Sequence, residues 1–207
     1  MSRLAGALLA AILAGVQEAK TPEKVDLLQG LDFKKDAVLG KWAFEEKVLV
    51  APTVRFGRLQ LPYRPPEEYD VRLVAERKAG ADSIVLGLVG KGRQFAVVID
   101  AFAKDPSSGV DRVDGKAFPD NETKHPGRVV ENGKKVEIRV SVRKDRLTVT
   151  LVGKPLVDWK ADWSRVSLFE DWAVPDTGAL FLGAWTAPWH VHALELTPIT
   201  GEGRRTR

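Results

Sequence analysis

Apolar and polar residues alternate over residues 136–142, in the order Val-Glu-Ile-Arg-Val-Ser-Val. Because successive side chains of a strand point to opposite faces, this period of two predicts a strand with one buried and one solvated face. A turn at Lys144 and Asp145 leads to a second alternating run at residues 147–151, and Gly153 begins another turn. The segment therefore predicts a three-stranded antiparallel meander.

Other runs of the chain predict strands that are buried on both faces. Residues 84–89, 95–99 and 179–182 are almost continuously apolar, which is typical of strands in the middle of a sandwich. Many of the 12 prolines and 18 glycines fall between such runs, and the sequence has no long helical period. We therefore predict an all-β fold over residues 25–200, a two-sheet antiparallel jelly-roll sandwich with about a dozen strands.

The first 19 residues differ in pattern from the rest of the chain. Arg3 precedes a run of Ala, Leu, Ile, Gly and Val at residues 4–16, and charged residues end that run. The run is too short to span a bilayer comfortably and has the character of the apolar part of a secretory signal peptide. We therefore predict a signal peptide at residues 1–19, a linker at residues 20–24 and no membrane span after removal of the leader. An uncleaved N-terminal helix is the alternative.

The balance of charges and the lack of cysteine narrow the classes of function. The chain carries 32 basic and 28 acidic residues, a net charge of +4, so the charges nearly cancel. The dense basic cluster of Arg204, Arg205 and Arg207 is interpreted as a flexible tail over residues 201–207 rather than as a nucleic-acid site. The absence of cysteine excludes disulfides and thiol chemistry, and export without disulfides indicates a periplasmic or extracellular bacterial protein.

Two segments resemble one family of β-sandwiches. Residues 58–77, which contain Glu68-Tyr-Asp70, and residues 83–88 are similar to the concanavalin A-like (laminin G-like) and DUF1080-type domains of secreted bacterial proteins. Residues 136–159 resemble the strand, turn and Val-Asp-Gly-Lys hairpin of these domains, with Val152 in place of the usual Asp. The resemblance implies the jelly-roll fold and a function directed at carbohydrate.

The resemblance also implies an enzymatic alternative, because some DUF1080-type domains are associated with hydrolysis of 3-keto-disaccharides. Their final strands usually carry Gln-x-His and Arg-Asn-Ile steps, and residues 181–196 contain neither. Glycanases of the superfamily place several carboxylates along one strand. Glu68 and Asp70 begin that pattern, but Arg72 and Leu73 stand where the second glutamate would be. We therefore assign no catalytic residue.

Five of the six tryptophans lie between residues 159 and 189, and three of them follow an aspartate. A sugar ring offers an apolar C–H face and a rim of hydroxyls, so an exposed aromatic ring beside a carboxylate can contact both. Packing of the rings in the core is the alternative. We predict that a ligand-binding site lies at one aromatic edge, formed by Trp159, Trp163, Trp172, Trp185, Trp189 and His190.

Two groups of residues have patterns related to metal binding. His190 and His192 share a predicted strand face, but Leu194 and Leu196 continue that face, so we expect ordinary packing there. The loop at residues 111–122 holds five oxygen donors of the kind that calcium prefers, and many laminin G-like domains bind calcium on a loop. We expect a solvated acidic loop and no metal or other cofactor, with calcium as the alternative.

Together these patterns predict an exported, carbohydrate-directed binding module whose partner is a glycan or polysaccharide and not a nucleic acid. A glycoside or 3-keto-disaccharide hydrolase and a structural or protein-interaction sandwich are the alternatives. A hydrolase requires two carboxylates, or a carboxylate and a histidine, that converge in one pocket. The residues to inspect for such a pair are Asp100, Glu195, His190 and His192.

Overall fold

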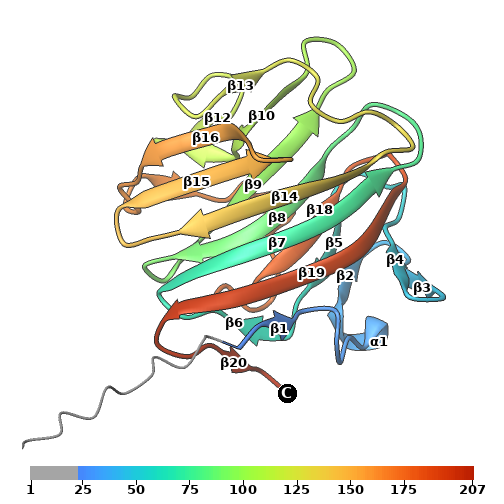
Figure 1. Ribbon diagram of the computed structural model, residues 1–207, viewed down its shortest axis with the longest axis horizontal. Coiled ribbons are helices and arrows are strands. Elements are labelled where there is room, and N and C mark those ends of the chain that lie inside the picture. The colour runs from blue at the N-terminus through green and yellow to red at the C-terminus, as the bar shows by residue number, and fades with distance from the viewer. Residues whose placement is uncertain (1–22) are drawn as a thin grey trace, which may run out of the picture.

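The computed structural model describes residues 23–207, which form two large antiparallel β-sheets packed face to face (Figure 1). The predicted all-β jelly-roll sandwich is confirmed. The predicted signal peptide at residues 1–19 lies outside the described residues, as does most of the predicted linker. In the part of the chain that the structure describes, no helix has the length and hydropathy needed to cross a membrane.

The larger sheet has eight strands, in the order β16-β15-β14-β7-β19-β4-β3 with β1 paired to β19. These strands are β1 (Val25–Asp26), β3 (Ala43–Glu45), β4 (Val48–Val50), β7 (Glu68–Arg77), β14 (Lys135–Val142), β15 (Arg146–Leu151), β16 (Lys154–Lys160) and β19 (Trp189–Thr200). The smaller sheet has seven strands, in the order β13-β10-β9-β8-β18-β5-β2. These strands are β2 (Ala37–Leu39), β5 (Gly57–Gln60), β8 (Ile84–Gly90), β9 (Arg93–Ala101), β10 (Ser107–Val110), β13 (His125–Pro126) and β18 (Phe181–Ala184).

Short elements complete the described chain. A three-stranded sheet and a two-stranded sheet pair in the orders β12-β11-β17 and β20-β6. The remaining elements are β6 (Tyr63–Arg64), β11 (Arg112–Val113), β12 (Lys116–Ala117), β17 (Val166–Ser167), β20 (Arg204–Arg205), the helix α1 (Phe33–Asp36) and the 3-10 helix η1 (Glu170–Trp172).

The predicted meander is confirmed as β14, β15 and β16. Val140 of β14 lies opposite Val149 of β15, which lies opposite Val157 of β16. β7 pairs with the other side of β14 and also with β19. Because β4 pairs with the far side of β19, β19 is an internal strand of the larger sheet.

A β-bulge in β19 changes which of its residues face the core. The register of β19 against β7 shifts at His192. Because a bulge adds one residue to a strand, Val191 before it and Leu194 after it are both fully buried. The prediction that Leu194 and Leu196 continue the face of His190 and His192 is therefore wrong, since both leucines are buried and both histidines are partly exposed.

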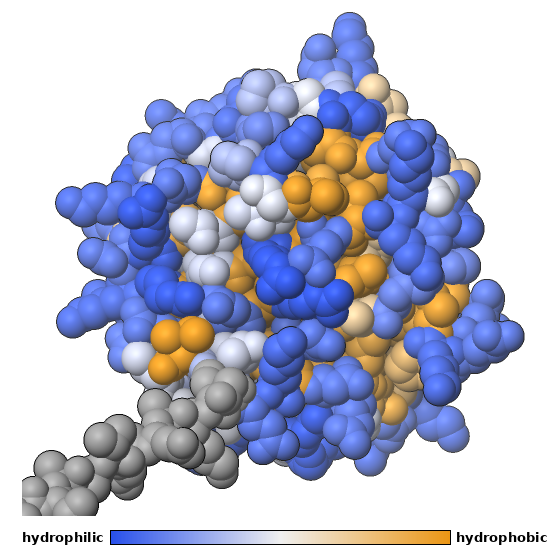
Figure 2. All heavy atoms as spheres, in the orientation of Figure 1, coloured by the Kyte–Doolittle hydropathy of each residue, from blue (hydrophilic) through white to orange (hydrophobic). Residues whose placement is uncertain are grey.

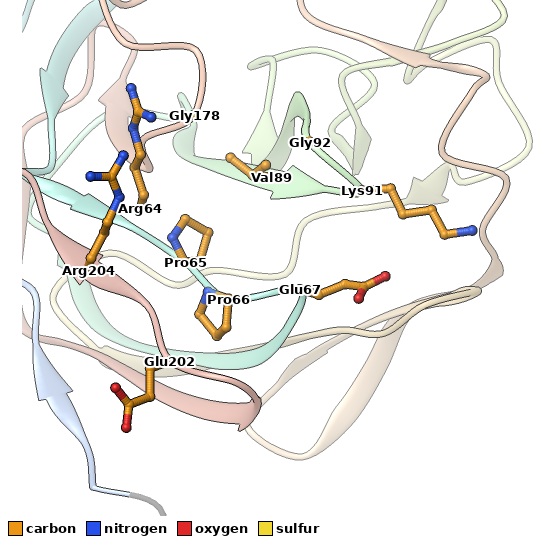
Figure 3. Close-up of a pocket in the computed structure, with 10 residues that line it drawn as sticks. All are labelled: Arg64, Pro65, Pro66, Glu67, Val89, Lys91, Gly92, Gly178, Glu202 and Arg204. Carbon is orange, nitrogen blue, oxygen red and sulfur yellow. The ribbon is translucent and has the colours of Figure 1, made fainter.

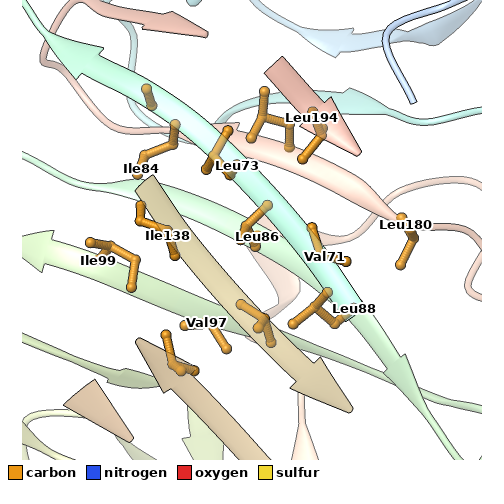
Figure 4. Close-up of a cluster of buried hydrophobic side chains, with 14 of the residues drawn as sticks. Val71, Leu73, Ile84, Leu86, Leu88, Val97, Ile99, Ile138, Leu180 and Leu194 are labelled. Atoms are coloured by element: carbon orange, nitrogen blue, oxygen red, sulfur yellow. The ribbon is translucent and has the colours of Figure 1, made fainter. Parts of the chain in front are cut away.

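The core lies between the two sheets. Alternate residues of β7, such as Val71 and Leu73, form one cluster with alternate residues of β8, such as Leu86 and Leu88 (Figure 4). These side chains are buried almost completely. Removal of apolar surface from water is the main favourable term in folding, so this cluster holds the two sheets face to face.

Charged side chains cover the outer face of the larger sheet. Arg72 of β7 donates hydrogen bonds to Glu137 of β14 at 2.7 Å and to Glu195 of β19 at 3.2 Å. Arg143 of the same face donates to Asp70 at 2.7 Å. Figure 2 shows this face as largely hydrophilic, with smaller hydrophobic areas. Opposite charges on neighbouring strands support the observed register.

The C-terminal residues pack against the rest of the domain. β20 pairs with β6, and the Arg205 guanidinium donates a hydrogen bond to the backbone carbonyl of Gln29 at 2.8 Å. Arg207 forms an ion pair with the buried carboxylate of Asp36. This arrangement differs from the flexible tail expected over residues 201–207, because the two guanidiniums find acceptors in the N-terminal part of the sandwich. The C-terminus accordingly lies near β1 and α1 in Figure 1.

Candidate ligand-binding pocket

Loops cover the outer face of the smaller sheet, in contrast to the charged outer face of the larger sheet. Side chains of that face and of the loops form a second hydrophobic cluster, made of Val85, Ala96, Val98, Ala101, Phe118, Trp172, Val174 and Phe181. Strands that are apolar on both faces need cover on both faces. The burial of β8, β9 and β18 on both sides therefore confirms what their continuous apolar runs predicted.

A pocket of about 230 Å³ opens in this cover, and we call it the aromatic pocket. Six aromatic side chains line it: Phe56, Phe102, Phe118, Phe169, Trp172 and Trp185. Its polar lining residues are Asp82, Ser83 and Asp111. Small-molecule binding sites are usually concave, with mostly apolar walls and a few polar groups.

Phe56 lies at the centre of the aromatic packing. Its ring meets Trp172 and Trp185 edge to face, with centroids 4.9 and 4.3 Å away. Phe102 and Phe118 form a second pair, stacked with their centroids 5.5 Å apart. Phe102 is 44% exposed and Trp185 is partly exposed, whereas Trp172 is buried. The pocket therefore offers partly exposed rings next to buried ones.

Two of these aromatic residues have an unusual backbone. Phe56 and Phe102 have φ values of 56° and 67°, in the left-handed region. A bulky residue in this region is strained by about 1–2 kcal/mol, and such strain is concentrated at ligand-binding and active sites. The fold thus maintains two pocket rings in positions that their local conformational preference does not favour.

The pocket contains two carboxyl groups with different environments. Asp111 is buried, and its Oδ2 atom accepts a hydrogen bond from the backbone N–H of Phe169 at 2.8 Å. Burial raises the pKa of the Asp111 carboxyl, while that hydrogen bond and the nearby Arg112 act in the opposite direction. Asp82 is partly exposed and accepts a hydrogen bond from Thr186 Oγ1 at 2.7 Å.

Arginine side chains lie over two of the aromatic rings. The guanidinium carbon of Arg112 is 4.9 Å from the centroid of Phe169, and that of Arg55 is 6.0 Å from the centroid of Trp185. Both distances fall within the range of cation–π attraction. The arginines therefore help to hold these rings in place at the pocket.

A buried charge cluster fixes the backbone at the pocket. Asp100 accepts hydrogen bonds from Arg77 at 2.5 Å and from Arg128 at 2.8 Å. The same two guanidiniums also bind carbonyls of pocket residues, Arg77 that of Asp82 at 3.4 Å and Arg128 that of Phe102 at 2.7 Å. Asp100, which the sequence singled out for a catalytic pair, thus bridges two arginines and does not line the aromatic pocket.

The structure separates the tryptophans that the sequence placed at one edge. Trp172 and Trp185 line the aromatic pocket. Trp159 and Trp163 pack against each other elsewhere, with their centroids 6.1 Å apart, and Trp189 is fully buried in the main core. Of the five predicted tryptophans, four are buried, and Trp185 alone is partly exposed.

Each buried indole N–H outside the pocket finds an acceptor, which explains why these rings pack inside. Trp163 Nε1 donates to the backbone carbonyl of Arg143 at 3.1 Å, and Trp189 Nε1 donates to that of Asp82 at 3.1 Å. Burial of an aromatic ring is strongly favourable once its polar atom is satisfied. His190 lies apart from the pocket, on β19 opposite Val50 of β4.

The sequence analysis missed the phenylalanines and Asp82. Phe56, Phe102, Phe118 and Phe169 lie outside the long strands and far apart in the sequence. Their one local signal is that they are large apolar residues in predicted loops, where exposed apolar surface marks interaction sites. That signal does not say which loops meet.

Several of the residues with metal-related patterns have protein partners. The Arg165 guanidinium binds the carboxylates of Asp114 at 2.6 Å and Glu122 at 2.9 Å, both in the predicted acidic loop. His192 Nε2 lies 3.3 Å from the Glu76 carboxylate. Within residues 23–207, no group of three or more histidine or acidic side chains is arranged to hold a metal ion.

A larger and more polar cleft lies at the other end of β8. It has a volume of about 650 Å³, and Figure 3 shows Arg64, Lys91 and Arg204 around a base that contains Pro65 and Pro66. Arg64 forms two hydrogen bonds with the Asp176 carboxylate, each of 2.9 Å. This cleft has no aromatic wall, so it lacks the stacking surface that the aromatic pocket provides.

Solved structures share this fold at low sequence identity. The carbohydrate-binding module CBM66 from Bacillus subtilis has a TM-score of 0.53 at 12% identity, over 86% of this chain and 97% of that chain. The VIP36 exoplasmic/lumenal domain, in its Ca²⁺/Man2-bound form, has a TM-score of 0.57 at 12% identity, over 86% and 88%. The apo Crh5 transglycosylase has a TM-score of 0.57 at 10% identity, over 87% and 85%.

These likenesses define the class of fold. They support the two-sheet antiparallel jelly-roll fold that the sequence predicted, and the concanavalin A-like resemblance stays a prediction. The chain matches no family model and no curated protein sequence. The DUF1080-type resemblance stays a prediction.

Proposed function

We propose that this domain binds carbohydrate, and that the aromatic pocket is the binding site. The observation that carries the proposal is the presence of partly exposed aromatic rings, Phe102 and Trp185, beside the carboxyl groups of Asp82 and Asp111 in one concave site. An aromatic face suits the C–H face of a sugar, and carboxyl oxygens accept hydrogen bonds from its hydroxyls. The carbohydrate-binding module CBM66 and the Man2-bound VIP36 domain, which share this fold, agree with this class of ligand.

The size of the pocket limits the part of the glycan that enters it. Its volume of about 230 Å³ is below the range of about 300–1,000 Å³ typical of sites for drug-sized ligands. One sugar ring is therefore the expected occupant, with the rest of the glycan outside.

We also propose that the domain is exported, because residues 4–16 have the pattern of a signal peptide. Detection of an intact Met1 N-terminus on protein from its native cells would contradict export.

The proposal is tested by a glycan-array screen followed by titration calorimetry with the glycans that bind. Replacement of Trp185 or Phe102 by Ala removes a ring face and should weaken binding by about 1–3 kcal/mol. Phe44 is also an exposed phenylalanine, 41% accessible, but does not line the pocket. Phe44→Ala is the matched control, and its affinity should stay unchanged.

Stability measurements separate loss of the site from loss of the fold. Trp163→Ala removes a buried ring outside the pocket, and we expect it to lower the free energy of unfolding by about 3–5 kcal/mol. Phe102→Ala should leave thermal unfolding almost unchanged. An equal effect of Phe44→Ala and Phe102→Ala on glycan affinity, or no glycan bound at all, would exclude the aromatic pocket as the site.

Hydrolysis of a glycoside is the second candidate function, and one specific observation favours it. Two carboxyl groups, Asp82 and Asp111, line the same pocket, and the pKa of Asp111 is raised by its burial. A carboxyl with a raised pKa is suited to act as a general acid beside an ionised partner. Hydrolysis would be established if a bound glycan releases new reducing ends and the Asp111→Asn variant does not release them. Binding of the glycan without any product would reject hydrolysis.

A further inference from the structure

A third hollow lies at the rim of the sandwich and shares no lining residue with the aromatic pocket, although its Arg128 binds the backbone carbonyl of Phe102. It has a volume of about 800 Å³ and is formed by the loop after β13, the start of β14 and the β15–β16 hairpin. Its apolar lining includes Val136, Leu151 and Leu156, which belong to the edge of the main core. Because four of its lining residues are arginine or lysine, we call it the cationic groove.

The fold neutralises some of these positive charges and leaves others. Arg128 is paired with Asp100 at 2.8 Å, and Lys134 with a neighbouring glutamate at 2.8 Å. Lys135 and Lys154 also line the groove. Among the ion pairs of residues 23–207, none includes either of these two lysines. Lys135 lies opposite Glu76 of β7, but that carboxylate is already bound by Lys78 and His192, so both ammonium groups are available to an anion.

Val152 adds an independent mark of function to the groove. It lies at the tip of the β15–β16 hairpin, the residue is 63% exposed, and its φ is 48°. Gly153 follows with a φ of 77°, and in a hairpin turn with two such residues the first one is usually Asn, Asp or Gly. A β-branched residue in this conformation is a genuine outlier. The hairpin thus holds a strained apolar side chain in solvent, beside two free lysines.

The combined chemistry selects a class of ligand. Free ammonium groups favour carboxylate or sulfate, while Val152 and Leu156 favour an apolar surface on the same molecule. The volume lies within the range of about 300–1,000 Å³ that accommodates a drug-sized ligand or a short oligomer. An acidic sugar carries both features, since its ring has an apolar face and its substituent is an anion. A flat membrane surface does not match a concave groove.

We propose that the cationic groove binds an acidic oligosaccharide, one whose sugars carry carboxylate or sulfate groups. The proposal adds a second glycan site to the function proposed above and does not depend on the aromatic pocket. Lys135 and Lys154 bind the anionic groups, and Val152 packs against a sugar ring.

Calorimetry on the full chain tests the charge requirement. The probes are a trigalacturonate for carboxylate, a heparin-derived tetrasaccharide for sulfate and maltotetraose as the neutral control. Replacing Lys135 and Lys154 together by Ala should weaken binding of at least one acidic probe by about tenfold. Each partly screened ion pair is expected to contribute roughly threefold to the affinity, and the two factors multiply. Binding of maltotetraose, if present, should not change, because a neutral sugar makes no use of the two charges.

A matched variant distinguishes the groove from general attraction to a basic protein. Lys41 and Lys160 are exposed and lie outside the groove, so Lys41→Ala with Lys160→Ala removes the same net charge elsewhere. This double variant should bind the acidic probes as the parent does. Equal weakening in both double variants would overturn the proposal in favour of diffuse electrostatic attraction.

Val152→Asn provides the sharpest separation of a binding role from a structural one. Asn tolerates positive φ better than Val, so this change should raise the melting temperature, yet it should weaken acidic-sugar binding about threefold or more because the apolar contact is lost. A higher melting temperature with unchanged affinity would remove Val152 from the site. Failure of both acidic probes to bind, or equally tight binding of poly-glutamate, would overturn the assignment to acidic sugars. Neither result alters the Trp185 and Phe102 test of the aromatic pocket.

Discussion

The carboxylate of Asp100 has no contact with solvent and binds three donors: the guanidiniums of Arg77 and Arg128, and the backbone N–H of Val129 at 2.7 Å. Arg77 is itself almost completely buried. A buried charge is tolerated only where a partner and hydrogen bonds compensate it, and loss of one partner leaves the other uncompensated. The stability of this region therefore depends on the single negative charge of Asp100.

Asp100→Asn should lower the free energy of unfolding by about 3–5 kcal/mol, because it leaves the buried Arg77 without a counter-charge. Urea unfolding of both proteins measures the change. Asp158→Asn is the control, since its pair with Arg146 is more than half exposed and should contribute less than about 1 kcal/mol. A similar small loss in both variants would contradict a structural role for the buried cluster.

Asp111 should make the stability of the domain depend on pH in a predictable direction. Burial raises the pKa of this carboxyl in the folded state above its ordinary value of 3.8, so the unfolded chain releases the proton at lower pH than the folded one. The stability that the protonated carboxyl contributes is fully present below pH 3.8. It is lost as the pH rises through the folded-state pKa. Asp111→Asn cannot ionise and should therefore gain stability relative to the parent as the pH rises from 3 to 7. Urea unfolding at these pH values measures it, and the opposite trend would refute it.

Strands β8 and β18 carry glycines where aromatic rings cross the smaller sheet. Gly87 of β8 lies opposite Phe181 of β18, and a Cβ at Gly87 would overlap the Phe181 ring. A Cβ at Gly183 would lie 2.7 Å from the Trp172 ring. Phe181 and Trp172 stack with their centroids 6.4 Å apart, so the two glycines make room for the rings that lie under the aromatic pocket.

Gly87→Ala should destabilise the domain by about 1–3 kcal/mol, because the Phe181 ring must leave its position in a close-packed cluster. The variant should also weaken glycan binding, since Trp172 packs on Phe181. Gly178→Ala is the control, because its Cβ would approach the flexible Arg64 side chain no closer than 3.3 Å. Thermal unfolding and calorimetry measure both effects, and parent-like behaviour of Gly87→Ala would refute the packing argument.

The elements differ in how far the sequence predicts them. The meander of β14 to β16 follows from alternation over residues 136–142 and two local turns, all of it short-range information. The bulge at His192 was not predicted, although the large apolar residues change phase between Val191 and Leu194, because that change does not show which residue is extra until the pairing with β7 is known. A one-residue shift in register exchanges the two faces of a strand, so a template that assumes one unbroken period of two assigns the residues after a bulge to the wrong face.

The two outer faces of the sandwich have opposite characters. The face of the larger sheet is closed by ion pairs between its own strands, such as Arg72 with Glu137, and needs no cover. The face of the smaller sheet is apolar and is covered by loops, which bring Phe56, Phe118 and Phe169 together. The sequence predicts that one outer face is polar and that the other needs cover. Which loops provide that cover depends on the folded sandwich, which brings distant segments together. The aromatic pocket could therefore not be predicted from the sequence.

The internal position of β19 has a consequence for how the domain is made. β4 and β7 are held in one sheet through β19, whose residues follow those of every other strand of that sheet along the chain. Until residues 189–200 have left the ribosome, the backbone edges of β4 and β7 that pair with β19 lack their shared partner. Pairings that join segments so distant in sequence are slow to form and expose unfinished chains to aggregation. Nascent chains of this domain should accordingly need a chaperone or a delay in compaction, and folding should be completed only after synthesis of β19.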